Sequence, residues 1–117
     1  MLSISRDEFE RLVSEALDGV PAELLGLLSN VVVLVADEPP PGEEPDLLGL
    51  YEGIPLTERD TSYSGVLPDH ITIFREPALR MCSSWQEAVD EIRITVVHEI
   101  AHHFGIDDDR LHELGYG

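Results

Sequence analysis

Residues 98–108 read His98-Glu99-Ile100-Ala101-His102-His103-Phe104-Gly105-Ile106-Asp107-Asp108. On an α-helix that turns by about 100° per residue, His98 and His102 lie roughly 40° apart on one face, so both imidazoles can reach a single metal ion. Glu99 lies about 100° round from His98, where it can hold a water bound to that ion. The pattern therefore predicts two metal ligands and a general base on one helix.

The residues after this helix supply a further ligand. Gly105 can adopt the left-handed conformation that ends a helix, which lets the acidic run that follows fold back towards the histidines. That run also places negative charge at the start of a short last helix through Leu114, where it suits the helix dipole. On the residues alone the third ligand stays open, and the candidates are Asp107, Asp108, Asp109, His112 and Glu113.

The spacing H-E-x-x-H-x-x-G-x-x-D resembles the motif of the Asp-zincin metallopeptidases, in which an aspartate replaces the third histidine of the metzincins. Together with residues 50–56, 71–75 and 111–116, it resembles a family of small bacterial zincin-like metallopeptidases. The resemblance covers most of the chain after about residue 31. It implies an α+β fold, a minimal zincin domain in which a small mixed sheet packs on the long helix that carries the motif.

The resemblance favours Asp108 as the third ligand, because Asp108 stands at the aspartate position of the motif. His98, His102 and Asp108 would then hold one zinc ion (Zn2+) per chain, with a fourth position open to water, as is typical of catalytic zinc. Glu99 would be the general base in zinc-dependent hydrolysis of a peptide bond. Tyr116 is the candidate donor to the oxyanion, or the floor of the site.

A Met-turn cannot form that floor, because Met1 and Met81 both precede the motif. So short a chain also leaves few residues for the walls of a substrate cleft. The alternative to a zinc peptidase is therefore a non-catalytic zincin-like module that binds a metal or another protein. Weaker candidates to line or support the site are Tyr51, Glu52, Glu91 and Thr95.

Composition limits the classes of partner. The chain has 117 residues, 43% of them hydrophobic, which suits one compact domain over residues 1–117. Its formal net charge of -17, from 24 acidic and 7 basic residues, repels phosphate backbones and anionic membranes. We expect a peptide or protein substrate, no nucleic acid and no membrane. A small domain with several apolar faces can also form a homodimer.

Cysteine content and the N-terminus indicate the compartment. Cys82 is the only cysteine, which excludes an intramolecular disulfide and suits a reducing environment. The N-terminus shows no basic segment followed by an apolar run, and no stretch approaches the ~20 apolar residues of a membrane span. We therefore expect a cytoplasmic protein.

Capping patterns predict the helices. Ser5 and Glu8 form a capping box for a first amphipathic helix, and a shorter helix begins at Pro21. One of the serines at 83–84 caps the long motif helix, because Glu87 follows at the spacing of a second capping box.

Apolar runs predict three strands. The β-branched run over residues 31–36 indicates a strand buried on both faces and central in the sheet. Residues 47–51 form a second strand. Residues 70–75 alternate as a strand does, and we assign to them the edge position at which a zincin binds extended peptide. Loops are expected at residues 38–46, 54–56 and 58–65.

Overall fold

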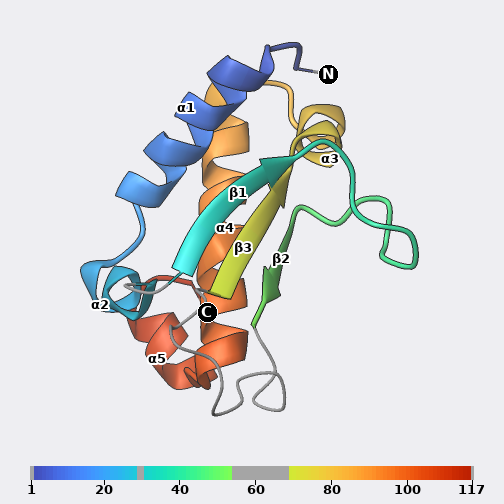
Figure 1. Cartoon of the computed structure of the whole chain (residues 1–117). Helices are drawn as coiled ribbons and strands as arrows, with labels where there is room; N and C mark the ends of the chain where they lie inside the picture. The colour runs from blue at the N-terminus through green and yellow to red at the C-terminus, as the bar shows by residue number, and fades with distance from the viewer. Residues whose placement is uncertain (1, 29–30, 54–68, 117) are drawn as a thin grey trace.

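The computed structural model describes residues 2–28, 31–53 and 69–116 (Figure 1). In chain order the elements are α1 (Arg6–Asp18), α2 (Ala22–Leu25), the 3-10 helix η1 (Gly26–Leu28), β1 (Val31–Ala36), β2 (Gly49–Glu52), β3 (Asp69–Phe74), α3 (Arg75–Met81), α4 (Trp85–Phe104) and α5 (Asp108–Glu113). The small mixed sheet and the long helix α4 confirm the predicted α+β class. None of the helices described is both long and apolar enough to cross a bilayer. The loops predicted at 54–56 and 58–65 lie outside the described residues.

Local signals fix the helix starts where the sequence predicts them. The Ser5 hydroxyl accepts a bond from the Glu8 N–H at 3.2 Å, and the Glu8 carboxylate accepts one from the Ser5 N–H at 3.0 Å. The Ser5 N–H also lowers the pKa of Glu8. At the start of α4, Ser84 accepts a bond from the Glu87 N–H at 3.1 Å. Both predicted caps are therefore confirmed.

Helix α3 was not predicted. The strand expected to reach Arg75 ends at Phe74, and α3 begins directly after it. Pro77 lies in the first turn of α3, where the N–H that proline lacks would have no partner within the helix. Cys82 follows α3 and is 1% exposed. Burial raises the pKa of its thiol, so the side chain is a protonated part of the core.

The strand order β1-β3-β2 corrects two expectations. β1 is an edge strand, and its Val32 and Leu34 are 42% and 45% exposed, so it is neither central nor buried on both faces. β3 is central, since it pairs in parallel with β1 and antiparallel with β2. A β-branched run suits any strand, and only long-range pairing decides which one lies in the middle. The sheet edge beside α4 is that of β2.

Helix α4 runs behind the sheet and packs on α1 and β2 (Figure 1). Between these layers lies a core of fully buried side chains from three elements. They are Phe9 and Leu12 from α1, Ile71 and Ile73 from β3, and Ile92, Val96 and Ile100 from α4. Because Ile100 belongs to this core, the packing reaches into the motif and fixes the position of its helix.

Candidate metal centre

The motif occupies the C-terminal turns of α4. Val97 and Ile100 are fully buried, whereas His98 and His102 are exposed. The two histidines lie one helical turn apart, so they share a face of the helix that the core does not cover.

Gly105 directs the chain from α4 into α5. Its φ is 70°, the left-handed conformation that the sequence predicts and in which a side chain is strained. Asp107 then caps α5 by accepting a bond from the Arg110 N–H at 2.8 Å. Asp108 and Asp109 follow in the first turn of α5. The turn thus returns two carboxylates towards the end of α4.

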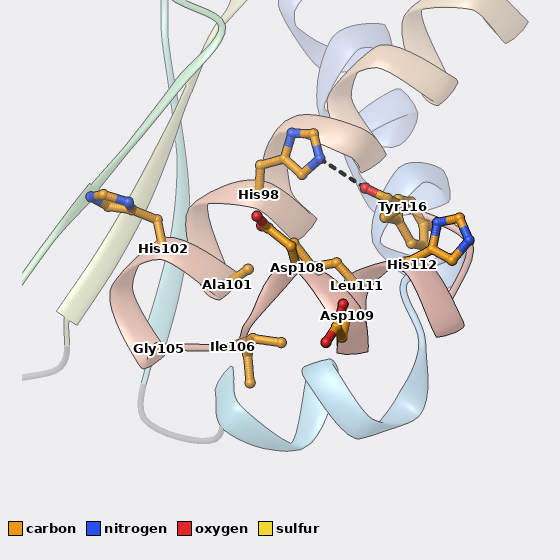
Figure 2. Close-up of a pocket in the computed structure, with 10 residues that line it drawn as sticks. All are labelled: His98, Ala101, His102, Gly105, Ile106, Asp108, Asp109, Leu111, His112 and Tyr116. Carbon is orange, nitrogen blue, oxygen red and sulfur yellow. Dashed lines mark hydrogen bonds between the residues drawn. The ribbon is translucent and has the colours of Figure 1, made fainter.

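A cavity of about 840 Å³ lies between the end of α4 and α5 (Figure 2). Its lining residues are His98, Ala101, His102, Gly105, Ile106, Asp108, Asp109, Leu111, His112 and Tyr116. The cavity brings together the three predicted metal ligands and the half-buried Tyr116. Glu99, the predicted general base, does not line it.

The predicted ligands border this cavity without converging. The His98 Nε2 lies 3.4 Å from the Tyr116 carbonyl oxygen. Figure 2 shows the His102 ring turned away from the cavity and the Asp108 carboxylate between the two histidines. Within residues 2–28, 31–53 and 69–116, no three histidine, cysteine or carboxylate side chains are grouped so as to hold a metal ion. Metal binding would therefore require these side chains to rotate.

The donor set nevertheless fits zinc in its chemistry. Two imidazoles and one carboxylate are a common ligand set of catalytic zinc. Histidines four residues apart on a helix have Cβ atoms about 5–6 Å apart, which suits a shared ion. His98, His102 and Asp108 are all exposed, so their side chains are free of the core packing that would oppose a rotation. These are the residues that would hold zinc.

Two of the alternative third ligands are engaged elsewhere. Asp107 caps α5, and Glu113 accepts a bond from Arg110 at 2.7 Å. Arg110 also donates to Glu23 of α2 at 2.8 Å, which ties α5 to the N-terminal part of the chain. This bond lowers the pKa of Glu23 and raises that of Arg110. The alternatives that border the cavity are Asp109 and His112.

Glu99 faces the sheet. Its side chain is half-buried, and its Oε2 accepts a bond from the Tyr51 N–H of β2 at 3.3 Å. The Tyr51 hydroxyl donates to Asp69 at 2.8 Å, and the Tyr51 ring stacks on His103 with centroids 3.8 Å apart. The sequence named Tyr51 only as a weak candidate and did not point to Asp69 or His103. The available signal was that His103 follows Glu99 by one helical turn and so shares its face.

The other weak candidates make contacts of a different kind. The Glu52 carboxylate lies 3.2 Å from the His70 Nε2, across the pair of strands β2 and β3. The Thr95 hydroxyl donates to the Glu91 carbonyl at 2.8 Å, within α4 itself. None of the weak candidates Glu52, Glu91 and Thr95 lines the cavity.

Comparison with known proteins places this arrangement in a family. No curated protein sequence matches the chain. Among solved structures, it is similar to a conserved hypothetical protein from Thermo thermophilus, with 26% sequence identity, a TM-score of 0.56, and coverage of 86% of this chain and 94% of the other. The zincin-like metallopeptidase family matches residues 28–117, which include the sheet, α4 and the whole cavity. The chain belongs to the zincin-like metallopeptidase family.

Proposed function

We propose that this protein is a zinc-dependent peptidase that hydrolyses peptide bonds with Glu99 as general base. The observation that supports the proposal most is the arrangement of the end of α4. Two histidines and Asp108 border one cavity, while Glu99 is held on the neighbouring flank of the same helix. Membership of a metallopeptidase family supports the class of chemistry.

The mechanism assigns one task to each group. Zinc, when bound by His98, His102 and Asp108, would supply a Lewis acid and lower the pKa of a bound water to about 7. The Glu99 carboxylate accepts a proton from the attacking water as the water oxygen bonds to the peptide carbonyl carbon. The carbon–nitrogen bond then breaks, and Glu99 returns the proton to the leaving amine. Tyr116, at the cavity wall, is the candidate donor to the oxyanion.

The proposed substrate is an extended peptide. β3, which contains residues 70–75, is central in the sheet, and α4 packs along the edge of β2, so the proposed binding surface is the cavity that the predicted metal ligands border. A net charge of -17 favours cationic peptides over anionic ones and disfavours nucleic acid. A single buried cysteine supports a reducing compartment, and we propose the cytoplasm.

The Glu99→Gln variant tests this function. Glutamine keeps the size and the acceptor oxygen of the side chain but cannot take a proton from water. Hydrolysis of a quenched peptide library should fall by about 10²–10⁴-fold, the usual contribution of a general base. Zinc content, measured by elemental analysis, should stay at the wild-type level. Unchanged hydrolysis, or loss of zinc together with activity, would remove Glu99 from its proposed role.

A non-catalytic metal-binding or interaction module is the second candidate. The observation that favours it is the separation of the predicted ligands in the described part of the chain. A wild-type protein that binds zinc but cleaves no member of the library would select this alternative. Cleavage that depends on both zinc and Glu99 would exclude it.

A further inference from the structure

β2 and the end of α4 lie side by side, and every second residue of the strand lies beside every fourth residue of the helix. The Tyr51 N–H bonds to Glu99, and a Cβ added at Gly49 or at Gly53 would meet Thr95 or His103, respectively. Two residues of a strand span about 6.6 Å and four residues of a helix about 6 Å, so strand and helix stay in register over this length. The approach is close, because a Cβ at Gly49 would lie 3.0 Å from the Thr95 Cγ2. Glu99 therefore meets β2 at a defined position.

The Tyr51 N–H that meets Glu99 points away from β3. The Phe74 N–H donates to the Leu48 carbonyl at 2.9 Å, which makes these two a hydrogen-bonded pair of the antiparallel ladder. Such pairs alternate along a strand, and Tyr51 and Ile71 form a pair without these bonds. The backbone groups of Tyr51 therefore point away from β3. The Glu99 carboxylate thus accepts a bond from the outer edge of the sheet.

The side chain of Tyr51 is held from two directions. Its hydroxyl donates to the Oδ2 of Asp69, the first residue of β3, at 2.8 Å. Its ring stacks on His103 at 3.8 Å between centroids and 21° between planes, and meets the Phe104 ring edge-on at 5.9 Å. The ring is therefore fixed both to the sheet and to the helix turn that follows Glu99.

We propose that Tyr51 is the positioning residue for the general base. Asp69 and His103 fix the Tyr51 side chain, which fixes its backbone, and the Tyr51 N–H then selects one orientation of the Glu99 carboxylate. A carboxylate that the fold has already oriented has no further rotamer freedom to lose in the transition state, which lowers the free-energy barrier of the reaction. The inference rests on the general-base role proposed for Glu99.

Amide hydrogen exchange of the full-length protein tests the contact without any substrate. In the Glu99→Ala variant, the Tyr51 amide should exchange about 10-fold faster or more, because its N–H loses the bond to the Glu99 carboxylate. The Leu50 amide is the internal control. Leu50 belongs to the pairs bonded to β3, so its protection should be unchanged. Equal exchange of the Tyr51 amide in both proteins would overturn the inference.

Kinetics test the consequence. Tyr51→Phe removes the bond to Asp69 and keeps the ring in the stack, so kcat should fall by about three- to tenfold with KM and zinc content unchanged. Tyr51→Leu also removes the stack and should lower kcat further. The matched control is Leu50→Ala, a truncation on the opposite face of β2, which should leave kcat within about twofold of wild type.

Combination with Glu99→Gln separates positioning from general support of the fold. If Tyr51 acts through Glu99, Tyr51→Phe should cause no further loss of kcat in the Glu99→Gln background. Independent, multiplicative losses, or an equal loss in Leu50→Ala, would overturn the inference. A zinc-bound wild type without any peptidase activity would overturn the proposed function instead, and the exchange rate of the Tyr51 amide would still decide whether the contact exists.

Discussion

On one flank of the last turns of α4, Glu99 and His103 face β2 and are held by bonds and ring stacking. On the other flank, His98 and His102 border an open cavity, and the only bond described for either imidazole is a 3.4 Å contact of His98 with a carbonyl. One helix thus carries a fixed base and loosely held ligands within residues 98–103.

The difference has a physical reason. A metal ion orients its own ligands when it binds, and the binding free energy offsets the loss of side-chain freedom. A general base receives no such help, because its partner is a water molecule. We infer that the fold itself must hold Glu99, through Tyr51, whereas it need only bring His98, His102 and Asp108 to the same cavity.

Substitution of the adjacent histidines should separate the two flanks most strongly. His102→Ala removes a predicted ligand and should weaken zinc binding by more than about 100-fold, the upper range for residues that only support a ligand. His103→Ala removes a ring that contacts Tyr51, Asp69 and Phe104 but is not a predicted ligand, and should leave the zinc affinity within about threefold of wild type. Competition with a zinc-binding dye measures both. Equal loss of zinc affinity in the two variants would contradict the assignment of His102, and not His103, as a metal ligand.

The buried face of α4 near the motif should contribute more to the free energy of unfolding than the exposed face that carries the histidines. Ile100 is 0% exposed, so Ile100→Ala should lower the free energy of unfolding by about 2–5 kcal/mol. His98→Ala, at an exposed position two residues earlier, should change it by less than about 0.5 kcal/mol in the absence of zinc. Urea denaturation of both variants provides the measurement. A large cost of His98→Ala would mean that its flank already supports the fold without metal.

The acidic triplet offers a finer test of the ligand flank. Asp107→Ala removes the cap of α5 and should cost about 0.5–2 kcal/mol of stability. Asp109→Ala, one position past Asp108, should change stability by less than about 0.5 kcal/mol. Thermal and urea unfolding can compare the two. A cost for Asp109→Ala as large as that for Asp107→Ala would contradict the assignment of Asp107 as the cap.

The smallest effect concerns the exposed bond that ties α5 to α2. Arg110 holds the pKa of Glu23 below its usual value of 4.5. The stabilisation is therefore complete above pH 4.5 and is lost as the pH falls through the lower folded pKa. Glu23→Gln should make the acid-side decline of the free energy of unfolding shallower. Urea denaturation above and below pH 4.5 measures the pH dependence of the free energy of unfolding. Glu43→Gln, in the loop before β2, is the control. Identical pH profiles of wild type and Glu23→Gln would contradict the prediction.

Local signals in the sequence predicted the parts of the fold that depend on neighbouring residues. The capping serines Ser5 and Ser84 lie three residues before glutamates, and Gly105 lies where α4 must turn. Each of these depends on a few successive residues, which the sequence shows directly. The placement of Asp108 at the cavity follows from the same turn.

Features that depend on distant residues were wrong or missing. The apolar run of β1 and the alternation of β3 do not specify which strand lies in the middle of the sheet. The contact of Tyr51 with Glu99 joins residues 48 positions apart and depends on the register between β2 and α4. Gly49 permits the close approach of β2 to Thr95, but a glycine in a strand is equally typical of a bulge or a turn.

Zinc content of the wild type, Asp108→Ala and Asp109→Ala, purified without chelator and reloaded with zinc, tests the central claim most directly. We predict one zinc per chain in the wild type, retained in Asp109→Ala and lost in Asp108→Ala. A wild type that binds no zinc after reloading, or an Asp108→Ala variant that binds it as tightly as wild type, would contradict the assignment of His98, His102 and Asp108 as the metal site.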